Sequence, residues 1–234
     1  MRGDVGGFIA RTGALAGVVV IAPHPDDESA GCGGLIAGCT QRGVPVRIIQ
    51  LTDGAASHRS DAWPPPRLAA LRAAEMDEAV RSLGVREPVT AIGLPDAGQP
   101  SVGVERRAAA RIARLLARWR PGLVLTTWRR EPHCDHRLAY RVAKRACELT
   151  RTPLAEYLVW TPVTGGPGDR PKLGEGLAFS VTLTAAQRAA KRQALQCHAS
   201  QRGEVVHDDP NGFVLDPQTE AAMTGLHEDY VLPW

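Results

Sequence analysis

Short apolar runs alternate with longer helical patterns along most of the chain. Runs typical of buried strands cover residues 13–22, 44–54, 89–96, 122–128, 155–163 and 177–183. Amphipathic patterns typical of helices cover residues 33–43, 64–85, 103–122, 134–150 and 184–201. Strands and helices that alternate in this way form βαβ units. We therefore expect an α/β fold that is Rossmann-like, with a mostly parallel sheet and helices on both faces, as a single domain over residues 1–234.

The charge balance excludes several classes of partner. The chain carries 28 Lys and Arg against 25 Asp and Glu, a net charge of +3, and many of its arginines lie at helical spacing among alanines. This pattern is typical of a solvated helix face and argues against nucleic acid. No apolar window reaches the length of about 18 residues that a membrane helix needs.

The N-terminal apolar stretch follows Arg2 and Arg11, as the apolar part of a signal peptide follows basic residues. However, Asp4 lies early and no small-residue cleavage site follows, so we interpret the stretch as a strand. The five cysteines are an odd number without a CxxC pair, which fits neither a disulfide framework nor a thiolate zinc site. We expect reduced thiols and a cytoplasmic protein.

Histidines and acids follow several of the expected strands. HPDDE (24–28) ends the first, LTDG (51–54) the second, LPD (94–96) the third and WRREPHCDH (128–136) the fourth. Because the carboxyl ends of parallel strands meet at one edge of a sheet, these segments are expected to gather on one rim, where open α/β sheets bind ligands.

A metal site is the chemistry that this rim favours. His24 and Asp27 are three residues apart after a rigid strand, and imidazole and carboxylate are ordinary zinc ligands. His133 and His136 are both candidates for a third ligand, and Fe²⁺ or manganese would suit the same donors. Asp26 could then accept a proton from water, and a second histidine could stabilise an oxyanion. Alternatively, each cluster could simply cap a helix.

The motifs together resemble the LmbE-like, or PIG-L, family of zinc-dependent deacetylases. APHPDDE with GCGGLIA is similar to that family's first signature, and HCDH to its second, which usually has proline where Cys134 stands. LTDG, RAAEMDEAVRSLG, LPD and KRQALQCHASQ follow in the family's order, so the resemblance covers about residues 16–202.

The resemblance implies a role for individual residues. The implied zinc ligands are His24, Asp27 and His136, and the implied general base is Asp26. His133 would be the cationic residue that stabilises the oxyanion or protonates the leaving amine, with Asp135 orienting it. Arg72 and Asp96 match positions that contact the sugar in some members, although Arg72 could be a surface residue and Asp96 a turn former.

The resemblance implies hydrolysis of an N-acetylated amino sugar or glycoside, such as an N-acetylglucosamine derivative, to acetate and a free amine. One alternative is an amidase of the same family that acts on another acylated small molecule, such as a thiol conjugate. A non-enzymatic alternative is a nucleotide-binding Rossmann-type protein, but GCGG is no GxGxxG motif and would place pyrophosphate against acidic residues.

For the remaining residues the sequence supports a structural role or leaves the role open. Cys134 is interpreted as a small residue in proline's place, and His58, His198 and His207 as structural residues. The stretch 161–176 is interpreted as a loop. The C-terminal tail, which includes His227, could form a wall of the pocket or a subunit contact. The oligomeric state does not follow from the sequence.

Overall fold

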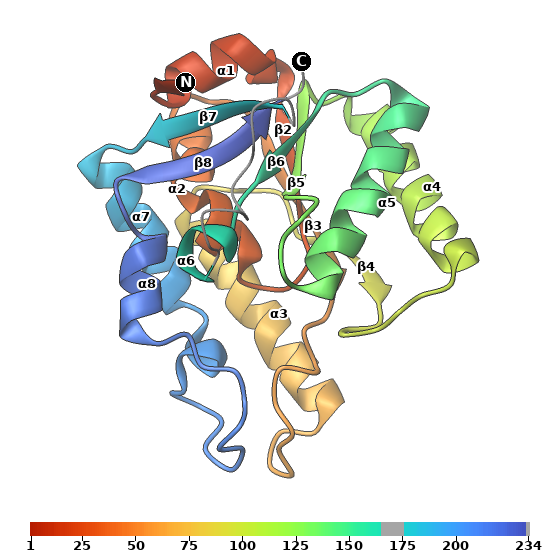
Figure 1. Ribbon diagram of the computed structural model, residues 1–234, viewed down its shortest axis with the longest axis vertical. Helices are drawn as coiled ribbons and strands as arrows, with labels where there is room; N and C mark the ends of the chain where they lie inside the picture. The colour runs from red at the N-terminus through yellow and green to blue at the C-terminus, as the bar shows by residue number, and fades with distance from the viewer. Residues whose placement is uncertain (165–175, 233–234) are drawn as a thin grey trace.

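The computed structural model describes residues 1–164 and 176–232, and Figure 1 shows a central sheet with helices packed on both faces. The strands in these ranges form one sheet in the order β1-β7-β8-β6-β5-β2-β3-β4. The strand β8 is antiparallel to both of its neighbours, and the other neighbouring strands are parallel. The mostly parallel α/β fold predicted from the sequence is therefore confirmed. The strands are β1 (Arg2–Gly3), β2 (Val18–Ala22), β3 (Val46–Thr52), β4 (Thr90–Leu94), β5 (Leu123–Thr127), β6 (Leu154–Tyr157), β7 (Leu177–Thr182) and β8 (His227–Leu232).

Helices flank these strands as the periodicity predicts. The helix α5 coincides with its predicted range, and α7 begins with a capping box in which Thr184 and Gln187 bond each other's backbone. Among the helices of the described ranges, none is long and apolar enough to cross a membrane. The helices are α1 (Val5–Thr12), α2 (Asp27–Gln41), α3 (Pro65–Ser82), α4 (Val102–Trp119), α5 (Cys134–Thr150), α6 (Thr161–Thr164), α7 (Ala185–Gln196) and α8 (Pro217–Met223), with 3₁₀ turns η1 (Ala14–Ala16) and η2 (Ala199–Arg202).

The two faces of the sheet have separate apolar cores. Along β2, Val18 and Val20 pack into a core shared with α1, α2, α3 and α7, whereas Val19 and Ile21 pack into a core shared with α4 and α5. Side chains alternate between faces along a strand, so a central strand covered on both sides is apolar at every position. This explains the continuous apolar run that precedes the HPDDE motif.

The N-terminal part of the chain differs from the prediction. The apolar stretch over residues 13–22 was interpreted as one strand, but Ala14–Ala16 form the 3₁₀ turn η1 and the strand β2 begins only at Val18. The helix α1 over Val5–Thr12, before this stretch, was not predicted. Asp4 caps α1 by accepting a hydrogen bond from the backbone N–H of Gly7, so the early acid marks a helix start. The second helix also starts earlier than predicted, at Asp27 inside the motif instead of residue 33.

The region after β6 also differs. Residues 161–163 were predicted to continue a strand, but Thr161–Thr164 form the short helix α6. Most of the loop predicted over 161–176 lies outside the described residues. The tail was expected to form a pocket wall or a subunit contact, yet most of it is the strand β8, which lies between β6 and β7 inside the sheet (Figure 1).

Strand β8 supplies a buried carboxylate to helix α2. Glu228 accepts hydrogen bonds from the backbone N–H groups of Gly34 and Leu35 at 2.8 and 2.9 Å. It also bonds Lys191 Nζ of α7 and the Tyr230 hydroxyl, each at 2.8 Å. The helix α2 leaves helical geometry at Cys32, so Glu228 satisfies amides that begin the second half of this helix. A buried network of this kind fixes the helix that carries HPDDE against the sheet.

Candidate metal centre

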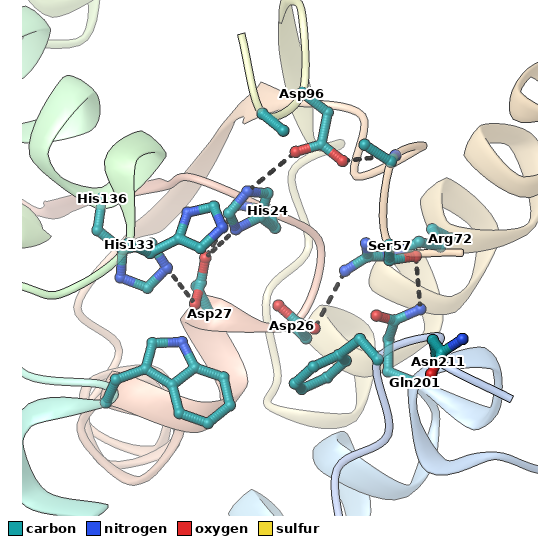
Figure 2. A pocket seen from close by; sticks show the side chains of 14 residues that line it. His24, Asp26, Asp27, Ser57, Arg72, Asp96, His133, His136, Gln201 and Asn211 are labelled. Carbon is teal, nitrogen blue, oxygen red and sulfur yellow. Dashed lines mark hydrogen bonds and ion pairs between the residues drawn. The ribbon is translucent and has the colours of Figure 1, made fainter. Parts of the chain in front are cut away.

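The predicted site residues gather at the carboxyl ends of the neighbouring strands β5, β2, β3 and β4. His24, Asp26 and Asp27 follow β2, Asp96 follows β4, and residues 133–136 follow β5. Figure 2 shows the side chains of His24, Asp26, Asp27, Asp96, His133 and His136 around one pocket. The rim predicted from parallel topology is therefore present, except that Asp53 of LTDG is exposed and accepts a hydrogen bond from Ala55 N instead of facing the site.

Asp27 lies between two imidazoles. Its Oδ2 is 3.1 Å from His24 Nδ1 and its Oδ1 is 3.2 Å from His136 Nε2. Burial alone would raise the pKa of Asp27, but His136 and His24 outweigh it and hold the pKa well below its usual range. The three residues predicted to bind a metal therefore share one buried point (Figure 2).

The outer nitrogen of His24 faces two further carboxylates. Its Nε2 is 3.2 Å from Asp135 Oδ2 and 3.2 Å from Asp96 Oδ1. The two acids are themselves fixed, because Asp135 accepts a hydrogen bond from Ala97 N at 2.8 Å and Asp96 accepts one from Ala56 N at 2.7 Å. A carboxylate behind the imidazole is the usual arrangement around a metal-bound histidine, since it orients the ring and sets its tautomer.

His136 has the same arrangement with a residue that the sequence analysis missed. Its Nδ1 is 3.4 Å from Glu131 Oε2, and Glu131 is completely buried. Burial alone would lower the pKa of His136, but Asp27 and Glu131 outweigh it and raise the pKa to about 9. Glu131 stands among arginines in WRREPHCDH and looks like part of a solvated charge run, so the pattern gave no signal for it.

These contacts fit a divalent cation. His24, His133 and His136 offer ligand atoms that all lie within 4.8 Å of one another. The nitrogen Nε2 of His136 is buried and has no hydrogen bond, although it faces Asp27. The inner nitrogens of His24 and His136 face the carboxylate of Asp27, and their outer nitrogens face other carboxylates. The site therefore offers the nitrogen and oxygen donors that Zn²⁺ and neighbouring transition metals prefer. The anionic surroundings also favour a positive charge at this point.

Asp26 has an unusual backbone conformation. Its φ is 136° and its ψ is −29°, a region that residues with a side chain rarely adopt. Its Oδ2 accepts a hydrogen bond from Arg72 at 3.1 Å, and the side chain faces the cavity. Burial raises the pKa of Asp26 to about 6, against the opposing charge of Arg72. Strained backbone held at a pocket is typical of functional sites.

The third acid of the motif points into the protein. Glu28 is completely buried, accepts hydrogen bonds from Ser29 Oγ and Asp26 N, and lies 3.4 Å from His198 Nε2. The three carboxylates of the motif thus point in different directions: Asp26 faces the cavity, Asp27 faces the imidazoles and Glu28 faces inward. His198, expected to be structural, is buried against Glu28 and does not line the cavity.

His133 lies at the mouth of the site, with 42% of its side chain exposed. Burial of the ring, followed by the charges of His24 and His136, lowers its pKa, which opposes the cationic form implied by the resemblance. Asp135 was expected to orient His133, but its carboxylate is 4.0 Å from His133 Nδ1 and lies closer to His24. The cause is local, because His133 is the N-cap of α5 and its Nδ1 accepts the backbone N–H of Asp135.

Arg72 and Asp96 line the cavity, but both are engaged by the protein. Arg72 is 2% exposed and donates to the carbonyl oxygens of Gly54 and Pro25 as well as to Asp26. Arg72 is therefore not a helix-surface residue, and its contacts join two loops to the carboxylate of Asp26.

Cys134 is the first residue of α5 and is partly exposed. The backbone N–H of the first residue of a helix makes no hydrogen bond within the helix, so proline, which lacks this group, and cysteine both fit there. His58 is buried beside Ser57, whereas His227 pairs with Thr182 on the sheet and does not line the cavity.

The cavity has a volume of about 400 Å³, and its remaining walls come from segments that the sequence analysis did not connect with the site. Trp160 follows β6, Gln201 lies in η2, and Phe213 lies before α8. The rings of Trp160 and Phe213 meet edge to face with centroids 5.7 Å apart. The lining residues are His24, Asp26, Asp27, Ala56, Ser57, Arg72, Asp96, Ala97, His133, His136, Trp160, Gln201, Asn211 and Phe213.

Comparisons with known proteins identify the family of this chain. The family model described as PIG-L, GlcNAc-PI de-N-acetylase, matches residues 19–147. The diacetylchitobiose deacetylase of Thermococcus kodakarensis is 34% identical over 125 residues, which cover 52% of this chain and 45% of the relative. The 1D-myo-inositol 2-acetamido-2-deoxy-alpha-D-glucopyranoside deacetylase of Rhodococcus erythropolis is 28% identical over 187 residues, 69% of this chain and 60% of the relative. The chain thus spans about half the length of these curated relatives.

The fold also matches a solved structure. The N,N'-diacetylchitobiose deacetylase of Pyrococcus horikoshii superposes with a TM-score of 0.64 and 24% sequence identity, covering 80% of this chain and 70% of that one.

Proposed function

The chain belongs to the PIG-L (GlcNAc-PI de-N-acetylase) family, and from this premise we propose that it is a metal-dependent hydrolase that removes the acetyl group from an N-acetylated amino sugar or glycoside. One observation carries the proposal. The inner nitrogens of His24 and His136 converge on Asp27, while their outer nitrogens face buried carboxylates. The relatives described above are deacetylases of amino sugars, which supports the substrate class.

His24, Asp27 and His136 would hold the metal, and the nitrogen and oxygen donors favour Zn²⁺, with Fe²⁺ as the alternative. A bound divalent cation would polarise the acetamide carbonyl and make water more acidic. Asp135 and Asp96 would hold the His24 ring, and Glu131 the His136 ring, so that a nitrogen lone pair of each faces the site.

The other residues would move protons. Asp26 faces the cavity and would accept a proton from the attacking water as a new C–O bond forms at the acetyl carbon. His133 is the exposed imidazole beside the same point. Because its Nδ1 accepts the backbone N–H of Asp135, its Nε2–H would donate a hydrogen bond to the oxyanion, while Asp26 would pass the proton it has accepted to the leaving nitrogen as the C–N bond breaks. The products are acetate and a free amine. Arg72 would hold Asp26 in its strained backbone conformation, since it also bonds the carbonyl of Pro25.

We extend the proposal to the whole chain as one domain with a cytoplasmic location. All five cysteines are unpaired, which is typical of proteins in a reducing compartment.

The test is acetate release by the metal-loaded protein from N-acetylglucosamine, its methyl glycoside and N,N'-diacetylchitobiose, with an N-acylated thiol conjugate added to the panel. We expect hydrolysis of at least one sugar, and a loss of about 10²- to 10⁴-fold in Asp26→Asn while metal content is unchanged. Asp53→Asn is the matched control, because Asp53 follows the neighbouring strand but accepts a hydrogen bond from the loop amide of Ala55 and does not line the cavity. Hydrolysis of the thiol conjugate alone would favour the amidase, and no difference between Asp26→Asn and the unchanged protein would contradict the mechanism.

A further inference from the structure

The backbone of Asp26 is restrained from the interior of the protein as well as from the cavity. Its φ of 136° describes rotation about its N–Cα bond, so a contact that fixes its N–H group also restrains φ. Glu28 Oε2 accepts this N–H at 3.1 Å. Arg72 bonds the carboxylate of the same residue and the carbonyl oxygen of Pro25. The strained residue is therefore held twice, by Arg72 at its side chain and by Glu28 at its backbone.

Glu28 is itself held by His198. The carboxylate of Glu28 is completely buried, and its Oε1 faces Ser29 Oγ at 2.6 Å and His198 Nε2 at 3.4 Å. Burial alone would lower the pKa of His198, but Glu28 and Asp26 outweigh it and raise the pKa, which favours the charged imidazole. His198 thus supplies positive charge to a carboxylate that has no access to water.

Packing alone does not account for an imidazole at this place. The His198 side chain is buried, and within residues 1–164 and 176–232 neither ring nitrogen makes a hydrogen bond of ordinary geometry. A buried polar atom without such a bond costs folding free energy, and a leucine would fill a similar volume without this cost. The ion pair with Glu28 is therefore what distinguishes histidine from an apolar residue here.

Helix α3 fixes the turn that carries His198. His198 is the N-cap of η2, and Ser200 in this turn donates its N–H and its hydroxyl to Glu75 at 2.8 and 2.6 Å. Glu75 is buried and lies three residues after Arg72, which places both on one face of α3. One helix therefore fixes both contacts to Asp26: Arg72 directly, and Glu28 through η2 and His198.

Resting on the proposed deacetylase function, we infer that His198 is a positioning residue for the general base. Its imidazole fixes the carboxylate of Glu28, and Glu28 fixes the N–H of Asp26, so that the Asp26 carboxylate stays directed into the cavity. His198 does not line the cavity, so it acts on the reaction only through Asp26.

The first test measures kcat and KM for acetate release by the metal-loaded protein from the sugar of the panel above that it hydrolyses. His198→Leu removes the donor, and we expect kcat to fall about 10- to 100-fold, the effect of a small displacement of a catalytic group. KM and metal content should be unchanged. His198→Gln places an amide NH₂ near the position of Nε2 and should keep kcat within about threefold of the unchanged protein. The control is His227→Leu, the same substitution at a histidine that pairs with Thr182 and does not line the cavity.

A double-mutant cycle separates the positioning of Asp26 from a general structural effect. Asp26→Asn removes the base, so adding His198→Leu to it should lower the residual kcat by less than about twofold. A general structural effect would instead multiply with that of Asp26→Asn. An unchanged kcat in His198→Leu, or an equal fold loss in both backgrounds, would overturn the inference.

Hydrogen exchange tests the same contact without any substrate. NMR should show the Asp26 amide exchanging about tenfold faster in His198→Leu than in the unchanged protein and in His198→Gln, with the amides of β2 as the reference for global stability. If His198→Leu does not fold, His198→Asn takes its place, because its shorter side chain does not reach Glu28. A failure of the proposed function is separate, because the unchanged protein would then release no acetate from any sugar. An Asp26 exchange rate that is equal in all variants would still refute the inference.

Discussion

Glu131→Gln tests whether a buried carboxylate sets the tautomer of His136. Glu131 Oε1 accepts hydrogen bonds from Val159 N, Thr161 N and Thr161 Oγ1, and Gln can keep these three bonds. Its Oε2 accepts Trp160 N and lies 3.4 Å from His136 Nδ1. An amide NH₂ at this position would donate to Nδ1 and move the imidazole proton to Nε2, the nitrogen that faces Asp27.

The expected effect has two parts. The amide group leaves Trp160 N–H without an acceptor, which costs about 1–3 kcal/mol of folding free energy. A protonated Nε2 cannot bind a metal, so metal affinity should fall about 10- to 100-fold, the usual effect of removing the group behind a ligating histidine. That range corresponds to about 1.4–2.8 kcal/mol of binding free energy.

The assay is competition for Zn²⁺ against a chromophoric chelator, with thermal unfolding of the metal-free protein measured alongside. Glu156→Gln is the matched control, because Glu156 on β6 is 4% exposed and bonds Arg129 without touching the histidines. Metal affinity that is equal in Glu131→Gln and the unchanged protein would refute the reasoning. So would an equal loss of affinity in Glu156→Gln.

Three further predictions concern the protein around the site. Lys191→Met leaves the buried Glu228 without its cation, so the free energy of unfolding, measured by thermal unfolding, should fall by about 3–5 kcal/mol. A loss below about 1 kcal/mol would contradict this prediction. Of the five thiols, only Cys134 and Cys197 should react quickly with a thiol reagent in the folded protein, because the other three are buried; fast labelling of three or more would be inconsistent with the packing. Arg72→Lys keeps the positive charge but not the forked contacts, so kcat should fall about 10²-fold with little change in metal content, and an unchanged kcat would show that these contacts are dispensable.

The sequence predicted the parts of the fold in which periodicity and burial agree. The alternation of cores along β2 and the amphipathic face of α5 are direct consequences of such patterns. The first turns of α2 were not predicted, because they contain the acids of HPDDE and Gly31, and glycine is unfavourable inside a helix. In the structure Gly31 allows close packing against Tyr157, and Gly34, which lies inside the predicted helix, allows it against Leu183.

The candidate site could likewise be predicted only in part from the sequence. Topology predicted which segments meet, because strand ends share one edge of the sheet. The partner of each side chain depends on distances across the fold, so Glu131 was missed and Asp135 was assigned to His133 instead of His24. The strand β8 was missed because its buried Glu228 makes HEDYVL look like an exposed tail. The acid is tolerated there because Lys191 on α7 pairs with it and the amides of α2 donate hydrogen bonds to it, and both depend on distances across the fold.

The central claim is that the chain holds one divalent cation between His24, Asp27 and His136. A crystal of the zinc-loaded protein, with diffraction data collected on both sides of the zinc absorption edge, tests it most directly. The account predicts a single strong anomalous peak at this position, with nitrogen and oxygen ligands at about 2.0–2.2 Å. An anomalous peak at another place, or none in protein whose bound zinc has been measured, would contradict it.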